Sequence, residues 1–235
     1  MPDLADLIHA RRSIRAFLPD PVPATLVREI LELAALAPSS SNMQPWRIYA
    51  ISGADLDDLK ARVRQSAASN PRGEMPEYPI YAPNLKDPYN ARRIACAEGL
   101  YGVIGVQRDD KFGRLMQFAR NFDFYGAPVG LIIALDRTME RGQWADVGIY
   151  LSHLLLLAQE RGLATCAQAA WAGMNRTVRA FLEMPEEYLL YCGVSLGYPD
   201  PDAPINRLRT GREPLSSTTQ MRGFVDQAAP AGPSA

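Results

Sequence analysis

The chain has 235 residues and carries 25 lysines and arginines against 26 aspartates and glutamates, for a formal net charge of −1. Its 47% hydrophobic and 22% charged residues exclude a largely disordered protein, and its length suits one domain with a full-sized core. The near-neutral balance lacks the basic excess of proteins that bind nucleic acid or anionic membranes. We therefore expect a globular protein that binds a small molecule, with no nucleic-acid and no membrane partner.

Two features bear on the cellular compartment. The longest run without a charged residue is fourteen residues, whereas a membrane-spanning helix needs about twenty apolar ones, and the opening MPDLADLIHARR lacks an apolar signal core. The three cysteines, Cys96, Cys166 and Cys192, are odd in number and far apart, so they predict neither a disulfide framework nor a CxxC pair. We expect a cytoplasmic protein.

The first fifty residues predict two helices and a strand. A short amphipathic helix at 4–10 is followed by a basic segment with three arginines, at 11–15. From Pro23, which can occupy a first helical turn, apolar residues recur at helical spacing as far as Pro38. The expected inward face consists of Leu26, Ile30, Leu33 and Ala37. A serine-rich loop then leads to a strand at 46–52.

A proline-rich stretch interrupts the middle of the chain. After an exposed helix at 54–68, the stretch 70–93 contains five prolines and three tyrosines, which prevents a regular helix or a central strand. Structureless loops of this length are usually functional or disordered, and the tyrosines favour function. We expect a substrate loop at about 70–93 and a helix over 94–119.

The second half of the chain alternates strands and helices. We expect strands at 129–135, 163–168 and 188–196, helices at 144–160 and 175–182, an extended arm after Pro199 and a disordered tail at 225–235. A βαβαβ run of the nucleotide-binding kind does not occur in this order. The elements predict a single α+β domain over residues 1–224, in which helices cover a sheet.

Several kinds of chemistry have little support in the sequence. His9 and His153, the only histidines, lie in helical segments without ligand-spaced neighbours, so we expect no metal site. Glycine-rich phosphate-binding fingerprints are missing as well. The stretch 193–197, GVSLG, matches the GxSxG of a nucleophile elbow, but no histidine follows it. A serine hydrolase that uses Ser195 is kept as an alternative to a buried strand of small residues.

Two separate segments are suited to an anionic, flat ligand. Arg11, Arg12 and Arg15 flank Ser13, and arginine forks bind phosphate bidentately. Hydroxyls and an amide at 39–42 precede Trp46, whose indole could form a wall for a flat ring. Each segment taken alone is also compatible with a solvated turn or an ordinary loop.

Taken together, RRSIRAF at 11–17 and PSSSNMQPW at 38–46 resemble the opening of the FMN-dependent nitroreductase family. The resemblance continues through GAPVGLIIALD at 126–136, GLATCAQAAWAGMN at 162–175, VSLGYPDPDAP at 194–204 and the closing Arg207, Arg209 and Arg212. It covers nearly the whole chain except 70–93 and the tail. The resemblance implies a mixed, mainly antiparallel sheet flanked by helices, in a domain-intertwined homodimer with two FMN sites at the interface.

The resemblance also implies roles for individual residues. Those expected to hold the phosphate, ribityl chain and pyrimidine edge of FMN are Arg11, Arg12, Ser13 and Arg15. Those expected from the partner subunit are Ser39, Ser40, Ser41 and Asn42, with Gln44 reaching toward the ring. The segment Gln168, Ala169 and Ala170 matches the backbone along the ring face, and Arg209 and Arg212 match the basic positions that complete the phosphate site. The family often has Lys or Glu where this chain has Arg15 and Ala169.

The activity implied by the resemblance is nitro reduction by a ping-pong mechanism. NADPH or NADH gives hydride to FMN, and a nitroaromatic then takes the same place and is reduced to the nitroso compound and the hydroxylamine. We expect no catalytic protein side chain, because solvent can supply the protons. Candidates for the substrate wall are Tyr78, Tyr81, Tyr89, Phe122, Phe124 and Tyr125. Alternatives are a same-fold flavin reductase for quinones, enones or halogenated aromatics, and a flavin-binding protein without turnover.

Overall fold

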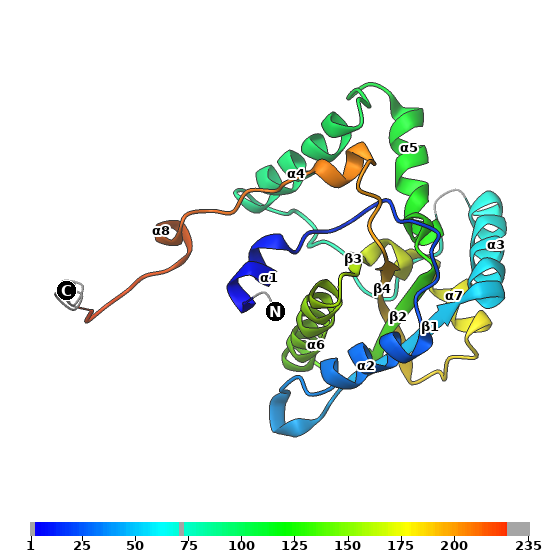
Figure 1. Ribbon diagram of the computed structural model, residues 1–235, viewed down its shortest axis with the longest axis horizontal. Coiled ribbons are helices and arrows are strands. Elements are labelled where there is room, and N and C mark those ends of the chain that lie inside the picture. The colour runs from blue at the N-terminus through cyan, green and yellow to red at the C-terminus, as the bar shows by residue number, and fades with distance from the viewer. Residues whose placement is uncertain (1–2, 71–72, 225–235) are drawn as a thin grey trace, which may run out of the picture.

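The computed structural model describes residues 3–70 and 73–224, and the predicted tail at 225–235 lies outside them. A four-stranded antiparallel sheet with the order β1-β2-β4-β3 forms the centre of the molecule, with helices on both faces (Figure 1). The strands are β1 (Trp46–Ser52), β2 (Val129–Asp136), β3 (Ala164–Gln168) and β4 (Tyr188–Gly197). All four begin and end within one residue of the predicted strands, and the predicted α+β class is confirmed.

The sequence of β2 explains its central position. All its residues except the last are buried, and neighbouring side chains point to opposite faces. Leu131 and Ile133 join the core under α2 and α6, whereas Ile132 and Ala134 join the core under α3 and α7. A continuous apolar run is therefore what a strand covered on both faces requires. An isolated parallel bridge from Ser13 to Thr165 on β3 makes the sheet mixed.

Helices and short 3-10 turns complete the fold. The helices are α1 (Leu4–Ala10), α2 (Ala24–Ala34), α3 (Gly53–Ser69), α4 (Tyr89–Val103), α5 (Lys111–Ala119), α6 (Arg141–Glu160), α7 (Asn175–Phe181) and α8 (Leu215–Thr218). The 3-10 turns are η1 (Ser40–Asn42), η2 (Arg120–Gly126), η3 (Ala169–Met174) and η4 (Pro204–Arg207). Among the described residues, none of these helices is both long and apolar enough to cross a membrane.

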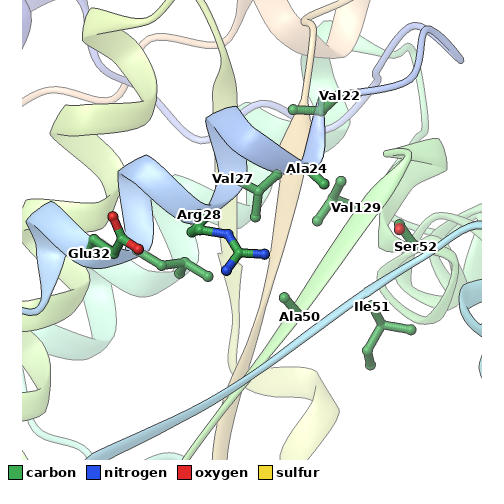
Figure 2. Close-up of a pocket in the computed structure, with 10 residues that line it drawn as sticks. Val22, Ala24, Val27, Arg28, Glu32, Ala50, Ile51, Ser52 and Val129 are labelled. Atoms are coloured by element: carbon green, nitrogen blue, oxygen red, sulfur yellow. The ribbon is translucent and has the colours of Figure 1, made fainter.

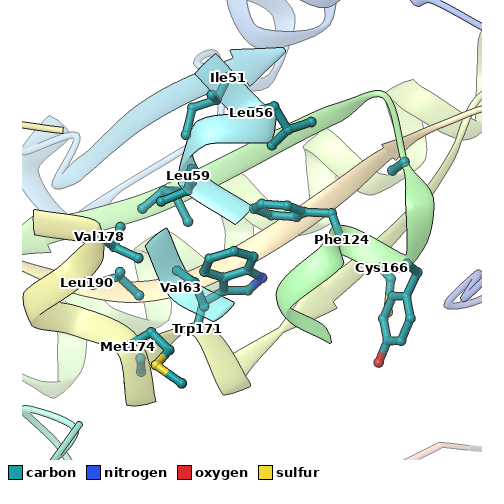
Figure 3. Packing of buried hydrophobic residues seen from close by; sticks show 14 of the residues in the cluster. Ile51, Leu56, Leu59, Val63, Phe124, Cys166, Trp171, Met174, Val178 and Leu190 are labelled. Atoms are coloured by element: carbon teal, nitrogen blue, oxygen red, sulfur yellow. The ribbon is translucent and has the colours of Figure 1, made fainter. Parts of the chain in front are cut away.

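An aromatic pair forms the centre of the core on the α3 side (Figure 3). The fully buried Trp171 stacks on Phe124, with ring centroids 4.2 Å apart and an interplanar angle of 22°. Gly193 on β4 makes room for it, since a Cβ there would lie 2.2 Å from the indole Cδ1. The small residues of the GVSLG stretch therefore allow close packing in a buried strand.

Two expectations about helix boundaries are wrong. The helix predicted at 94–119 is two helices, because Gly105 takes a left-handed φ of 70° and Asp110 caps a new helix through its bond to the Gly113 N–H (2.8 Å). The predicted loop at 70–93 ends earlier, at Pro88, because no proline follows to prevent helix α4.

The predicted inward face of α2 is also partly wrong. Ile30 and Ala37 are buried as expected and Leu26 is half-buried, but Leu33 is exposed, and the other buried residues of the helix are Val27 and Ala34. The spacing of 27, 30 and 34 is as helical as that of the predicted stripe. Periodicity alone could not choose between the two faces, and packing against α6 and the sheet selects the one with Val27.

Candidate functional site

The basic segment lies along the outer edge of the sheet. The Ile14 N–H donates to the carbonyl of Thr165 on β3 (3.0 Å), and the side chain of Ile14 is buried in the core. Asn206 holds the other end, because its Oδ1 accepts from the Arg15 N–H (2.8 Å) and its Nδ2 donates to the carbonyl of Ala16 (2.8 Å). The arginines around Ile14 are therefore presented from a fixed backbone.

Charges on this segment act on residues of the sheet and of η2. Burial raises the pKa of the Cys166 thiol on β3 to about 11, while the charges of Arg15 and Arg11 and a hydrogen bond with Ser13 act in the opposite direction. Burial likewise raises the pKa of Tyr125, again opposed by Arg15. Arg11, Ser13 and Arg15 thus gather near the same part of β3.

Arg12 and Arg209 form the most informative pair of side chains. Burial is the main cause that lowers the pKa of Arg12 below its usual value, and the positive charge of Arg209 lowers it further. Within residues 3–70 and 73–224, neither arginine has a carboxylate within 4.0 Å, and the same is true of Arg11 and Arg15. Guanidinium groups that repel each other without an acidic partner suit a multiply charged anion.

An open groove of ≈ 780 Å³ separates α4 from the C-terminal arm. Arg209 and Arg212 both line it, together with Arg92 and Cys96 of α4. Among the residues that the structure describes, the Arg212 guanidinium donates only to groups of Thr210 and Gly211, in an exposed stretch of the arm. The structure therefore brings Arg209 to Arg12, and it leaves Arg212 farther along the same arm.

The serine-rich loop is strained and lies apart from the basic segment of its own chain (Figure 1). Ser41, Asn42 and Gln44 have φ values of 49°, 57° and 49°, in the left-handed region that such residues rarely adopt. The buried carboxylate of Asp146 on α6 holds this loop by accepting from the Ser40 N–H (3.0 Å). The hydroxyl of Ser39 accepts from the Gln44 N–H (3.0 Å), and Gln44 Nε2 donates to the Asn42 carbonyl (3.0 Å).

The basic segment pairs with β3 at Thr165, three residues before the end of the strand. Ala169 is exposed and Ala170 half-buried, so their backbone is accessible to a ligand. The side chain of Gln168, by contrast, is buried and bonded to Asn121 and Ser195. The side chain of Gln168 is therefore not available to a cofactor, whereas the backbone of Ala169 and Ala170 is.

The predicted aromatic residues fall into three groups. Tyr81 and Tyr89 are exposed, and Phe122 in η2 is half-buried. The expectation for Tyr125, also in η2, is wrong, since its ring is buried and its hydroxyl donates to Asn121 Oδ1 (2.8 Å). The expectation for Phe124 is wrong, since the ring is fully buried against Trp171.

Tyr78 packs against α6 and β4. Its hydroxyl donates to the Tyr191 carbonyl, and its ring contacts Trp144 with centroids 4.8 Å apart. Tyr191 is the extra residue where the pairing of β2 and β4 shifts its register. Tyr78 is thus built into the packing of this bulge, and no contact joins it to the basic segment among the described residues.

Comparison with known proteins agrees with this geometry. The family model described as "Nitroreductase family" matches residues 8–198. This chain belongs to the nitroreductase family. The 4-nitrobenzoate reductase of Pseudomonas putida is 36% identical over 225 residues, which cover 94% of this chain and 96% of that protein. The nitrobenzene nitroreductase of Ectopseudomonas oleovorans is 36% identical, covering 93% and 96%.

Solved structures with the same fold are equally similar to this nitroreductase. The FMN and NADPH-dependent nitroreductase NfnB from sphigopyxis sp. strain HMH superposes with a TM-score of 0.92 at 38% identity, covering 95% of this chain and 100% of that one. The FMN-dependent NfnB of Mycobacterium smegmatis, solved in complex with NADPH, has a TM-score of 0.88 at 35% identity, covering 93% and 99%. The predicted family and sheet architecture are therefore confirmed.

Two other features of this nitroreductase are not candidates for its functional site. A groove of ≈ 360 Å³ lies between α2 and the edge strand β1. Val27, Arg28 and Ala50 are among the residues on its walls (Figure 2). None of the predicted cofactor-binding residues contributes to this lining. Ser195 of the GxSxG stretch is fully buried within β4, where a substrate could not reach its hydroxyl. The hydrolase alternative is wrong for this reason.

Sequence reasoning missed three residues that organise the nitroreductase site. Asn206 fixes the backbone of the basic segment, Asp146 holds the serine-rich loop, and Asn121 accepts the amide of Gln168. Each acts on a residue far away in the chain. No local pattern around them signals this, because buried polar side chains become recognisable only through their partners.

Proposed function

We propose that this nitroreductase binds FMN and uses NADPH or NADH to reduce nitroaromatic compounds through the nitroso compound to the hydroxylamine. The carrying observation is a basic segment that is bonded to β3 through Ile14 and Thr165 and whose arginines, like Arg209 of the arm, have no acidic partner in the described chain. The names of its relatives support the substrate class, since they are reductases of 4-nitrobenzoate, nitrobenzene and chloronitrobenzene. The solved NADPH complex of a relative supports the electron donor.

The residues present fit FMN. Its phosphate is a dianion, which suits Arg12 and Arg209, with Arg212 as a further cation along the arm. Arg11, Ser13 and Arg15 would hold the ribityl chain and the pyrimidine edge. Ala169 and Ala170 offer a backbone without bulky side chains, which suits the face of a flat ring. A cation near the pyrimidine edge would stabilise the negative charge of the reduced ring.

The chemistry needs little from the protein besides binding and orientation. Bound FMN supplies the transfer of electron pairs between nicotinamide and substrate, one pair per half-cycle. The first reduction consumes one NAD(P)H and one proton and releases water as nitro becomes nitroso. The second consumes another NAD(P)H and proton and yields the hydroxylamine. Solvent supplies the protons, and the arginines hold the cofactor while the open backbone at 169–170 leaves its face accessible.

We further propose a homodimer in which the partner's Ser39, Ser40, Ser41, Asn42 and Gln44 complete each FMN site. The separation of the serine-rich loop from the basic segment within one chain supports this arrangement (Figure 1). Large exposed apolar residues on α1, α5 and the C-terminal arm support it too, since burial against a partner would remove them from water. They include Leu4, Ile8, Phe112, Leu115, Met116, Phe118, Leu215, Met221 and Phe224.

For the substrate wall we propose Tyr81, Tyr89 and Phe122. Aromatic side chains stack well on electron-poor rings. The first two lie in or next to the exposed end of the tyrosine-rich stretch, which we propose as a substrate loop. We also propose a cytoplasmic location, supported by Cys96, Cys166 and Cys192, which are all free thiols.

An anaerobic absorption experiment tests the function. The purified protein, loaded with FMN, should show a yellow flavin spectrum that bleaches with NADPH or NADH and returns on addition of nitrobenzoate. A protein that binds no added FMN would contradict the whole proposal. Bleaching that a quinone or a halophenol reverses, while nitroarenes do so only sluggishly, would replace nitroarenes by another acceptor class.

A further inference from the structure

The side chain of Gln168 makes three hydrogen bonds beneath the proposed flavin site. Its Nε2 donates to the carbonyl of Asn121 (2.8 Å) and to Asn121 Oδ1 (3.3 Å), and its Oε1 accepts from the hydroxyl of Ser195 (2.7 Å). Gln168 is 3% exposed and Ser195 is fully buried. Both amide hydrogens and one acceptor site of the amide oxygen are thus used within the protein, and the side chain is buried away from a ligand.

The orientation of this amide is determined by its partners. Two acceptors on Asn121 face one end, and only a donor can meet them. The Ser195 hydroxyl at the other end donates to the remaining oxygen. Exchanging nitrogen and oxygen would set the amide oxygen against a carbonyl, so the side chain has one stable arrangement.

Asn121 in turn connects Gln168 to α5 and η2. Its Nδ2 donates to the Phe118 carbonyl in the last turn of α5 (2.8 Å), and its Oδ1 accepts from the hydroxyl of Tyr125 (2.8 Å). The stretch that follows is strained, with φ of 48° at Phe124 and 56° at Tyr125. A bulky residue adopts such a conformation only where its surroundings enforce it. The hydrogen bonds at Asn121 are among the contacts that enforce it.

Two buried side chains flank the neighbouring backbone, Gln168 before it and Trp171 after it. The isolated bridge that flanks β3 on its outer side joins Ser13 to Thr165, three residues before Gln168. Beyond that point β3 pairs with β4 on one side, ending at the pair Gln168 and Gly193. The next two residues are alanines, whose methyl groups can anchor little. The backbone at 169–170 is therefore held from its two ends, by Gln168 on the β3 side and by Trp171 on the η3 side.

We propose that Gln168 is a positioning residue: its buried amide, held by Ser195 and Asn121, sets where the 169–170 backbone meets the flavin ring and couples that backbone to α5. This inference rests on the proposed function for its flavin contact. The hydrogen-bonded clamp itself belongs to the protein alone and can be measured without FMN.

The test compares Gln168→Met with the same substitution at Gln143, whose amide makes one bond in the capping box of α6. Methionine keeps the length of the side chain and removes all three bonds. In the FMN-free protein, amide hydrogen exchange over 164–174 should become at least about tenfold faster in Gln168→Met, since lost buried hydrogen bonds of this kind change local opening by such a factor. Gln143→Met should leave exchange over 164–174 unchanged.

Ser195→Ala supplies a milder variant and a test of coupling. It removes one of the three bonds, so a smaller acceleration over 164–174 is expected. In the double variant with Gln168→Met, the exchange rate should equal that of Gln168→Met alone, because Ser195 acts through Gln168. In FMN-loaded protein, Gln168→Met and Ser195→Ala should shift the flavin visible bands and midpoint potential in the same direction, and Gln143→Met should not.

The outcomes separate this inference from the proposed function. Equal exchange in Gln168→Met and Gln143→Met, or additive effects of the Ser195 and Gln168 substitutions, would overturn the positioning role even if the wild type binds FMN and reduces nitroarenes. A wild type that binds no FMN would overturn the proposed function and the flavin contact together, whatever the exchange rates show. If Gln168→Met does not fold, Ser195→Ala decides: wild-type exchange over 164–174 in that variant overturns the clamp.

Discussion

The sheet-centred part of the molecule and its outer part differ in how many of their side chains are buried within one chain. Around the sheet, β2 is buried almost throughout, and residues such as Leu131, Leu154 and Trp171 are fully buried. The outer part, defined as α4, α5 and the arm from Leu208 to Phe224, contains no buried residue within the described chain. Phe112 and Phe224 in this part are 72% and 74% exposed.

The difference indicates which part is stable by itself. Burial of apolar surface is the main source of stability, and the sheet-centred part has it within one chain. The outer part exposes apolar side chains to solvent within one chain. The proposed dimer would bury them against the partner. The Arg12 and Arg209 pair joins the two parts, since Arg12 is attached to the sheet and Arg209 belongs to the arm. The proposed cofactor site thus lies at their border.

The largest effect is expected in the sheet. Leu131→Ala should lower the free energy of unfolding by about 2–5 kcal/mol, because it leaves a cavity in a fully buried strand. Urea denaturation with the apoprotein measures it. Leu36→Ala, at a residue that is 76% exposed, is the control and should have a far smaller effect. Similar losses in both would mean that the sheet is not the main source of stability.

At the border, Arg12→Ala should weaken FMN binding by about 1.5–3 kcal/mol, or roughly 10- to 150-fold in Kd, because a charge-assisted bond to the phosphate is lost. Fluorescence titration of FMN measures it. Arg209→Ala should have a similar effect, with Arg64→Ala on α3 as the control. If Arg12→Ala and Arg209→Ala both bind FMN like the wild type, the phosphate site has been assigned to the wrong residues.

In the outer part, Leu115→Asp should weaken dimerisation by about 1–3 kcal/mol, since a charge would replace a buried apolar contact. Its effect on the fold of one chain should be small, because Leu115 is 61% exposed there. Sedimentation over a range of concentrations measures the change, with Ala61→Asp on the exposed side of α3 as the control. Unchanged association in Leu115→Asp would remove this face of α5 from the interface.

Glu74 tests how the tyrosine-rich stretch is attached to the core. Burial alone would raise the pKa of Glu74, but hydrogen bonds from Thr177 and Ser66 and from backbone N–H groups outweigh it, so the pKa is lowered. A lowered pKa in the folded state stabilises the protein above the unfolded value of about 4.5, and this contribution is lost as the pH falls through the folded-state value.

Glu74→Gln should therefore cost about 1–2 kcal/mol at pH 7 and reduce the loss of stability between pH 5 and pH 3. Urea denaturation at several pH values measures both. Glu186→Gln, at an exposed carboxylate, is the control. An acid-induced loss as large in Glu74→Gln as in the wild type would show that Glu74 does not carry this pH dependence.

The smallest effect is expected from the ion pair inside the outer part. Arg92→Ala removes the contact between Arg92 and Glu213 (3.1 Å), in which both side chains are about 40% exposed. Exposed pairs contribute about 0–1 kcal/mol, so thermal unfolding should change little. A larger loss would show that the arm is held within its own chain more firmly than its exposure indicates.

Sequence patterns predicted those parts of the fold that depend on neighbours along the chain. The strands at 46–52 and 129–136 are each marked by β-branched and apolar residues between polar or glycine-containing turns. The split between α4 and α5 was missed, since a left-handed glycine and an aspartate cap are weak signals inside a helical pattern. The inward face of α2 was half missed because two apolar stripes compete.

The candidate site was predictable to the extent that its parts are continuous segments. The segments 11–15 and 38–46 have compositions that suit an anionic ligand, whereas 168–170 was assigned through the resemblance to the family. The role of Phe124 was not predictable, because its φ of 48° turns the ring toward Trp171 and away from any ligand. The clamp at Gln168 was equally hidden, since Asn121 and Ser195 belong to other elements.

By itself, the sequence determined the family, the α+β class, the four strands and the basic and serine-rich segments, because these depend on local composition and on spacing along the chain. Only the tertiary structure decided which arginines meet, which aromatic rings are buried and which polar side chains hold the site together. Arg15 and Asn206 are bonded across 191 positions of sequence. Contacts of this kind form between segments that are far apart in the sequence, and no local pattern encodes them.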